Sequence, residues 1–199
     1  MPQRKRAAFV NVLSGFKGLN LLGTANEKGQ TNLSVVSSVV HLGSNPPLLG
    51  MVMRPPSVSR HSYENILATG VYTLNHVNAA MAEQAHQTSA RYAEDESEFD
   101  QTGLTPIFNS GFHAPSVAES AISLGLALRD DMEVKLNACR FLVGEVMWVK
   151  FPESVFEEDG FLDIAKAGTI TVSGLDAYHT ANQLFRLSYA KPNLPLHKL

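Results

Sequence analysis

Residues Leu19 to Val40, LNLLGTANEKGQTNLSVVSSVV, decide the fold. The stretch begins with an apolar run that ends in a polar turn containing Gly29, and such a run is typical of a strand entering a hairpin. The return segment, residues 31 to 40, is rich in Val and Ser, which suits a pleated strand better than a helix. The stretch therefore predicts an antiparallel hairpin near the start of a β-rich domain.

Further strands are predicted on the C-terminal side of this hairpin. Asn45-Pro46-Pro47 interrupts the chain, because proline cannot donate a hydrogen bond to a strand ladder. Leu48 to Met53 is apolar on both faces, which predicts a central strand. The remaining predicted strands are 71–75, 121–128, 137–150 and a short one near 167–172.

Two helices are predicted between the strands. Tyr63, Ile66 and Leu67 recur at helical spacing, with Ser59 as a candidate N-cap and Gly70 where a left-handed C-cap falls. The Ala, Met, Glu and Gln content of residues 79–88 predicts the second helix. The acidic run 94–98 is interpreted as a solvated loop or a helix start, and the tail from residue 174 as irregular.

These elements predict one domain over residues 1–199, of the β-rich (α+β) class. Strands joined by short turns, without a βαβ rhythm, favour a closed or partly closed antiparallel barrel, which removes exposed strand edges. The predicted fold is a split antiparallel β-barrel with Greek-key character and a few inserted helices.

Composition excludes several classes of partner. The formal charge of −3 gives no general attraction to nucleic acid or to an anionic membrane. No apolar run reaches the roughly 18 residues that a membrane span requires. Cys139 is the single cysteine, so no intrachain disulfide can form, and a cytoplasmic location is expected.

Familiar catalytic motifs are absent from the chain. It contains no GxxxxGK[ST] phosphate loop, no GxGxxG after a strand, no GxSxG and no HExxH. With one cysteine, a structural zinc site is not expected. If the protein is an enzyme, an organic cofactor is expected to carry the demanding chemistry.

The first candidate binding segment is the strand of residues 31–38, TNLSVVSS. Asn32, Ser34 and Val36 share one face of a strand. Small polar groups beside flat backbone suit the rim of a planar heteroaromatic ligand. The same pattern also suits a surface strand whose Ser and Asn side chains face water.

The second candidate is the segment of residues 54–61, RPPSVSRH. Two arginines and two serines precede a helix start, and guanidinium groups, hydroxyls and free backbone N–H groups together favour an anion. An ordinary capped helix with exposed arginines explains the segment equally well. Together, the two segments indicate a phosphorylated ligand that carries a ring.

The sequence also resembles the flavin reductase-like family of FMN-binding split barrels over nearly its whole length. The stretches that carry the resemblance are, in family order, GTANEKGQTNLSVVSSVV, NPPLLGMVMRPPSVSRHSYENILATGVYTLN, AEQAHQTSARYAEDESEFDQTGLTP, APSVAESAISLGLAL, FLVGEVMWV and SGLDAYHTANQLFRLSYAKP. Their order and spacing, more than any single motif, are specific to the family.

The resemblance implies a set of FMN contacts in three regions. The strand contributes residues beside the ring and ribityl chain, the segment before the first helix contributes the phosphate site, and the chain's later segments contribute further polar contacts. In that order the implied residues are Thr31, Asn32, Ser34, Ser37 and Ser38; Arg54, Ser57, Ser59, Arg60 and His61; and Gln87, Ser89, Gly174, Asp176 and Tyr178. Family members often have an Asn and a Ser in the segment that matches residues 85–89, and here His86, Gln87 and Ser89 occupy it, which departs from the family pattern.

The resemblance further implies a homodimer that holds FMN noncovalently. The leading expectation is an oxidoreductase in which NADH or NADPH gives a hydride to flavin N5 and the electrons pass to a small-molecule substrate or downstream acceptor. Such chemistry needs no acid or base from the protein, so no catalytic side chain and no metal ligand is named. The rivals are a flavoredoxin-like FMN electron carrier that does not use NAD(P)H, and a binding module that has lost the flavin.

Overall fold

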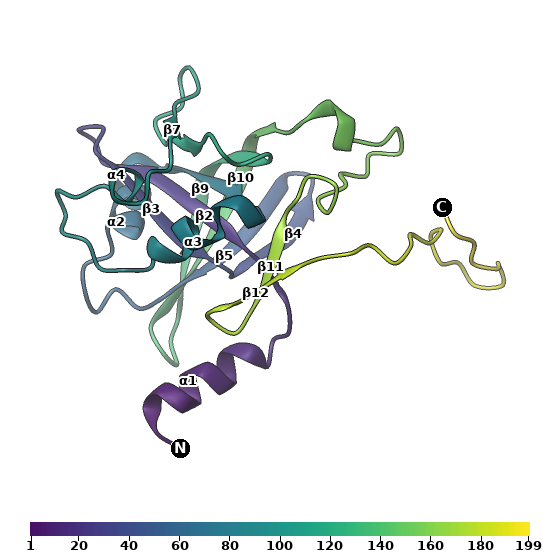
Figure 1. The fold of residues 1–199 in the computed structure, drawn as a ribbon, viewed down its shortest axis with the longest axis horizontal. Helices are drawn as coiled ribbons and strands as arrows, with labels where there is room; N and C mark the ends of the chain where they lie inside the picture. Colours follow the sequence, from purple (N-terminus) through teal and green to yellow (C-terminus); the bar gives the residue numbers. More distant parts are fainter.

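The computed structural model describes residues 1–199, and a seven-stranded antiparallel sheet forms its body (Figure 1). Its strands lie in the order β3-β2-β6-β9-β10-β5-β4. Their bounds are Asn20–Ala25 for β2, Thr31–Val36 for β3, Val39–Ser44 for β4, Pro47–Met53 for β5, Val71–His76 for β6, Ser123–Val134 for β9 and Cys139–Lys150 for β10.

The sheet is curled, as its connections require. The edge strands β3 and β4 follow each other in the chain and are separated only by Ser37 and Ser38. Two residues span roughly 7 Å, so the two edges of the sheet must approach each other. Backbone pairing does not continue between β3 and β4, and the barrel is therefore split at this point. The predicted Greek-key character stays a prediction.

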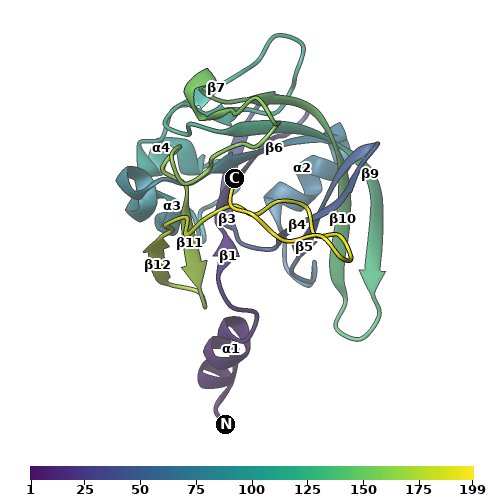
Figure 2. The same ribbon diagram turned by 90° about the vertical axis from the view of Figure 1, so that its right-hand side faces the viewer.

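Helix α2 (His61–Thr69) fills the concave side of the sheet (Figure 2). Its Tyr63 and Ile66 are buried in one core with Leu22, Leu74 and Leu126 of the sheet. The helix ends at Gly70, whose φ of 73° is the left-handed C-cap predicted from the sequence. The predicted cap at Ser59 is wrong, because Arg60 occupies the N-cap position and Ser59 binds a side chain instead.

A second core lies beyond β3 and is covered by short elements. These are η1 (Ala79–Met81), α3 (Ala82–Gln87) and α4 (Glu98–Thr102), together with a small sheet. Met81, Ala85 and Phe99 of these elements pack with Leu33 of β3 and Val172. The small sheet contains β1 (Lys17–Gly18), β11 (Ile170–Ser173) and β12 (Ala177–Thr180); the other minor elements are β7 (Pro106–Ile107), β8 (Ser116–Val117) and η2 (Glu153–Val155).

Three expectations from the sequence are corrected. The predicted strand over residues 31–40 is two strands that bend at Ser37 and Ser38. The tail is not irregular throughout, because residues 177–180 form β12 on a turn at Gly174, whose φ is 64°. The acidic run 94–98 is not wholly solvated, because Ser97 and Glu98 are buried by packing against β3.

The N-terminal helix and the C-terminal arm project from the body (Figure 1). Helix α1 (Gln3–Val12) was not predicted from the sequence, and none of its residues is buried. None of the helices is both long and apolar enough to cross a membrane. The sheet and α2 therefore form the framework on which the candidate site is built.

Candidate functional site

Strand β3 and the first turn of α2 meet through three polar side chains. Ser62 Oγ donates a hydrogen bond to Asn32 Oδ1 over 2.6 Å, and Ser34 Oγ lies 2.9 Å from Ser62 Oγ. The two candidate segments of the sequence are thus adjacent in space, because α2 packs across β2 and β3. Ser62 was missed in the sequence because serine in a helix gives no signal of its own.

Glu98 at the start of α4 anchors this group from the opposite side. Its carboxylate accepts hydrogen bonds from Asn32 Nδ2 at 2.8 and 2.6 Å and from the Leu33 backbone N–H at 2.8 Å. Only 6% of the Glu98 residue surface is exposed. Burial raises the pKa of the Glu98 carboxyl, although these hydrogen bonds and the nearby His61 charge oppose the shift. Both ends of the Asn32 amide are consequently engaged inside the protein.

The other predicted residues of this strand have separate partners. Thr31 Oγ1 lies 2.6 Å from Ser97 Oγ, which ties the start of β3 to the segment before α4. Ser38 Oγ donates to the Val52 carbonyl over 2.8 Å, where β3 gives way to β4. Ser37 is half-buried beside it and makes no side-chain hydrogen bond within the chain. Ser34 of β3 and Ser37 just after it both retain hydrogen-bonding capacity for a ligand.

Three arginines gather near the N-terminus of α2. Partial burial lowers the pKa of the Arg60 guanidinium, and the positive charges of Arg54 and Arg91 lower it further. The ion pairs of the structure involve other residues, so none of the three arginines has a carboxylate partner. Arg60 Nε donates to the Pro55 carbonyl over 3.0 Å, which orients the guanidinium group. Guanidinium groups without carboxylate partners, close enough for their charges to affect one another, favour a phosphate or another anion.

Ser57, Ser59 and His61 complete the predicted phosphate segment. Ser59 Oγ donates to both oxygens of Glu64, at 3.0 and 3.1 Å, and Glu64 also accepts from the Arg60 backbone N–H. Ser57 is exposed and makes no side-chain hydrogen bond. His61 is the first residue of α2 and lies half-buried. Glu64 therefore accepts hydrogen bonds from some of the donors at the start of its own helix.

The later predicted residues fall into two places. Tyr178 of β12 meets His86 of α3, with its hydroxyl 2.5 Å from His86 Nδ1 and the two rings edge to face. Gln87 donates to the Tyr92 hydroxyl over 2.9 Å, and Ser89 is exposed nearby. Burial, followed by the Asp176 charge, raises the pKa of Tyr178.

Gly174 and Asp176 lie in the turn between β11 and β12. The Gly174 carbonyl accepts from Lys17 Nζ over 3.0 Å, and Asp176 is exposed. No hydrogen bond joins either residue to the arginines or to β3 within one chain. The fold thus brings the β3 and α2 residues together and leaves this turn apart from them.

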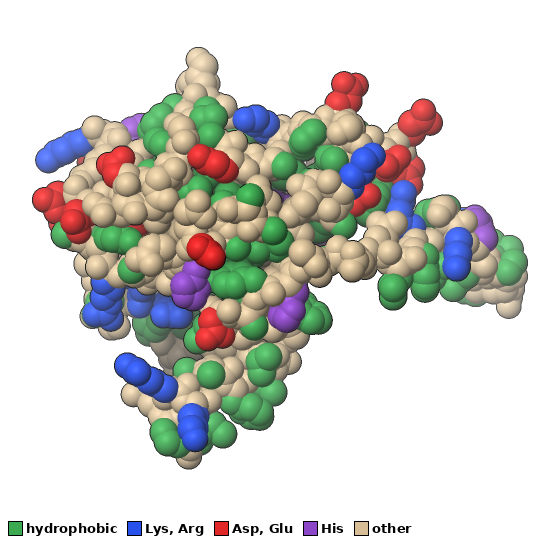
Figure 3. All heavy atoms as spheres, in the orientation of Figure 1, with side chains coloured by type: hydrophobic (Ala, Val, Ile, Leu, Met, Phe, Trp, Pro, Cys, Tyr) green, Lys and Arg blue, Asp and Glu red, His purple; other side chains and the backbone are tan.

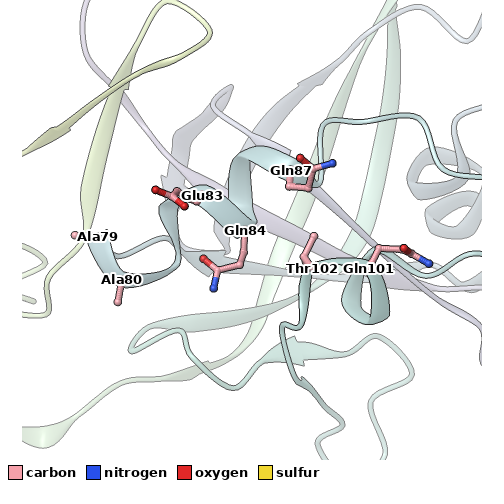
Figure 4. Close-up of a pocket in the computed structure, with 7 residues that line it drawn as sticks. All are labelled: Ala79, Ala80, Glu83, Gln84, Gln87, Gln101 and Thr102. Atoms are coloured by element: carbon pink, nitrogen blue, oxygen red, sulfur yellow. The ribbon is translucent and has the colours of Figure 1, made fainter.

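Two of the hollows on the surface lie beside these elements, and neither of the two is lined by the arginines. The larger, about 580 Å³, lies between η1–α3 and α4, with Gln84, Gln87, Gln101 and Thr102 around it (Figure 4). The smaller, about 180 Å³, includes Thr31, Asn32 and His61, but its rim carries Glu27, Glu64, Glu94 and Glu96. Carboxylates repel a phosphate, so an anion is expected on the arginine side of α2 instead.

The sequence reasoning missed three residues of this site. Glu98 and Ser62 hydrogen-bond with Asn32 of β3, and Arg91 lies near enough to Arg60 for its charge to lower the pKa of that guanidinium. Only Glu98 could have been found from the sequence, because an acidic residue just before the apolar Phe99 is typical of the first turn of a helix. Ser62 and Arg91 are placed by contacts between distant segments, and no local pattern reveals such contacts.

Comparisons with known proteins agree with this architecture. Residues 13–170 match the family model described as Flavin reductase like domain. A split-barrel protein of Shewanella frigidimarina NCIMB 400, provisionally named a flavin reductase, shares 51% sequence identity, with a TM-score of 0.92 over 96% of this chain and 94% of that one.

More distant structures share the fold. Nitrilotriacetate monooxygenase component B from Bacillus cereus is 19% identical, with a TM-score of 0.82 over 94% of this chain and 95% of that one. Flavoredoxin of Desulfovibrio vulgaris (Miyazaki F) is 24% identical, with a TM-score of 0.74 over 90% and 92% of the two chains. The matched residues and the split barrel together show that this chain belongs to the flavin reductase-like domain family, whose members are flavin-related oxidoreductases.

Proposed function

We propose that the protein binds one FMN noncovalently per chain and acts as a cytoplasmic NAD(P)H-dependent flavin reductase. The observation that carries the proposal is the group of Arg54, Arg60 and Arg91, which lack carboxylate partners beside a helix start. A terminal phosphate carries two negative charges and several acceptor oxygens, so it fits this donor set. Ser34 of β3 and Ser37 just after β3 are half-buried, and the ring and ribityl chain would border them.

The chain's own residues are proposed to bind and orient the flavin. The flavin, when bound, supplies the redox chemistry by accepting a hydride at N5. The arginines hold the phosphate, and β3 fixes the position of the ring by backbone and hydroxyl contacts. No side chain of the site is required to exchange a proton with substrate. Substitutions are therefore expected to act through flavin affinity or redox potential.

Absorption spectra test this function directly. Protein reconstituted with FMN is expected to be yellow after gel filtration, and its flavin band is expected to bleach anaerobically when NADH or NADPH is added. A control with free FMN at the same concentration measures the uncatalysed reduction. A flavin band that persists with both nucleotides would indicate an electron carrier, and failure to retain FMN would refute the flavin site.

We also propose that the functional unit is a homodimer. The arm after β12 exposes Leu184 and Tyr189 to 88% and 87%, and α1 exposes Phe9 and Val10. Figure 3 shows apolar side chains along both projections. Apolar surface of this extent on projecting segments is typical of protein interfaces. A second copy would cover them and could bring its β11–β12 turn, with Gly174 and Asp176, to the flavin.

Light scattering after size-exclusion chromatography tests the dimer. We expect a mass of twice the 21.6 kDa of one chain. Deleting residues 181–199 is expected to shift the population toward monomer, because the exposed apolar arm is lost. A single-chain mass for the full-length protein across micromolar concentrations would contradict the proposal.

A further inference from the structure

A chain of polar side chains runs from α4 through β3 to the first turn of α2. The Glu98 carboxylate accepts hydrogen bonds from Asn32 Nδ2, and Asn32 Oδ1 accepts one from Ser62 Oγ. Ser62 Oγ in turn lies 2.9 Å from Ser34 Oγ. Glu98, Asn32 and Ser62 are each at most 7% exposed, whereas Ser34 is half-buried. The hydrogen-bonded series therefore begins at a buried carboxylate and ends at Ser34, its one partly exposed residue.

The carboxylate determines the direction of every hydrogen bond in this chain. An ionised carboxylate only accepts, so the Asn32 amide must turn its NH₂ group toward Glu98 and its oxygen toward Ser62. Ser62 must then donate its single hydroxyl hydrogen to Asn32. Only lone pairs of Ser62 remain for Ser34, so Ser34 must donate its own hydrogen to Ser62. Ser34 consequently presents only lone pairs to a ligand.

We propose that Glu98 is a positioning residue that makes Ser34 an obligate hydrogen-bond acceptor for a donor group of the bound flavin. The inference rests on the proposed FMN site. The donor is either the ring imide N–H or a ribityl hydroxyl, because the other polar atoms on the edges of the oxidised ring only accept. A ligand that places a carbonyl against Ser34 is disfavoured, because two acceptors would face each other.

The test is Glu98→Gln, which keeps the shape of the side chain and allows the directions of these hydrogen bonds to reverse. The carbonyl of the introduced glutamine is expected to accept from the Leu33 N–H, as the Glu98 carboxylate does now over 2.8 Å. The introduced NH₂ group takes the place of Glu98 Oε1, 2.8 Å from Asn32 Nδ2, so two donors face each other there unless the Asn32 amide turns over, while the native orientation keeps its 2.6 Å hydrogen bond to the other oxygen. In the molecules in which the amide turns over, each hydroxyl reverses and Ser34 directs its hydrogen at the ligand, so FMN affinity is expected to fall by up to roughly 10-fold.

A double variant separates this effect from general damage. Ser34→Ala alone is expected to weaken FMN binding about 5-fold, because the acceptor is lost. In the Glu98→Gln background the same change removes an opposing donor, so Ser34→Ala is expected to restore affinity instead. Glu119→Gln is the matched control, because that carboxylate accepts hydrogen bonds from the Thr105 N–H and makes none to β3 or α2, so its loss should leave flavin affinity unchanged.

Fluorescence titration with FMN gives the dissociation constants of wild type and of the four variants, and thermal unfolding confirms that each variant is folded. A 3-methylated flavin that binds wild-type protein more weakly identifies the ring N–H as the donor, whereas equal binding identifies a ribityl hydroxyl. Independent losses in the double variant, or unchanged affinity in Glu98→Gln, would overturn the proposal. If Glu98→Gln does not fold, unchanged affinity in Ser34→Ala alone overturns it. If the variants give one of these overturning results while wild-type protein still binds FMN, the inference about Glu98 fails and the proposed function stands.

Discussion

Replacing Arg54 or Arg60 by alanine is expected to weaken FMN binding by about 1.5–3 kcal/mol per lost charge-assisted hydrogen bond. This corresponds to roughly a 10- to 150-fold higher dissociation constant for each variant. The reason is that neither guanidinium is neutralised within the chain, so its charge is available to the phosphate. Fluorescence titration of the apoprotein with FMN measures the change.

Riboflavin provides the internal control for this prediction, because it carries the ring and ribityl chain without the phosphate. Its affinity is expected to be the same in wild type and in both variants. Arg4→Ala removes the same charge from α1 and is expected to leave FMN binding unchanged. Equal losses for FMN and riboflavin would show that the arginines act on the fold instead of on the phosphate.

His76 is expected to make stability depend on pH between about 4 and 6.5. Burial lowers the pKa of its imidazole from 6.5 to about 4, and its Nδ1 lies 3.1 Å from Thr169 Oγ1. In this interval the unfolded chain binds a proton that the folded chain does not. The stabilisation is therefore fully present above pH 6.5 and is lost as pH falls toward 4. Its full size is about 3 kcal/mol.

Urea unfolding of wild type and His76→Gln at equal protein concentration isolates this contribution. Glutamine retains a polar partner for Thr169 but does not titrate. Carboxylates that titrate in the same range contribute equally to both proteins and cancel in the difference. The stability gap between the proteins is expected to move by about 3 kcal/mol from pH 7 to pH 4. Parallel pH profiles would contradict the assignment to His76.

Local patterns in the sequence were sufficient for most elements of the fold. The run before Gly29 and the Val-rich return strand predicted the β2–β3 hairpin, because alternation and turn residues are local properties. Gly70 marked the end of α2 correctly for the same reason, since a left-handed C-cap favours glycine. Helix α1 was missed because none of its residues is buried. A helix without a buried face does not need apolar residues at helical spacing, which is the pattern that reveals a helix in a sequence.

The sequence by itself determined the β-rich class, the two segments of the candidate site and the family, which follows from the order of the matched stretches. Tertiary structure alone decided how the polar groups pair. Glu98 is 65 residues from Leu33 and 66 from Asn32, and Ser62 is 30 from Asn32, so the hydrogen-bonded chain exists only after the sheet curls around α2. Burial likewise comes from packing between distant segments. This packing buried Ser97 and Glu98 at the end of an apparently solvated acidic run and made Glu98 the anchor of β3, because the exposure of a side chain depends on what covers it.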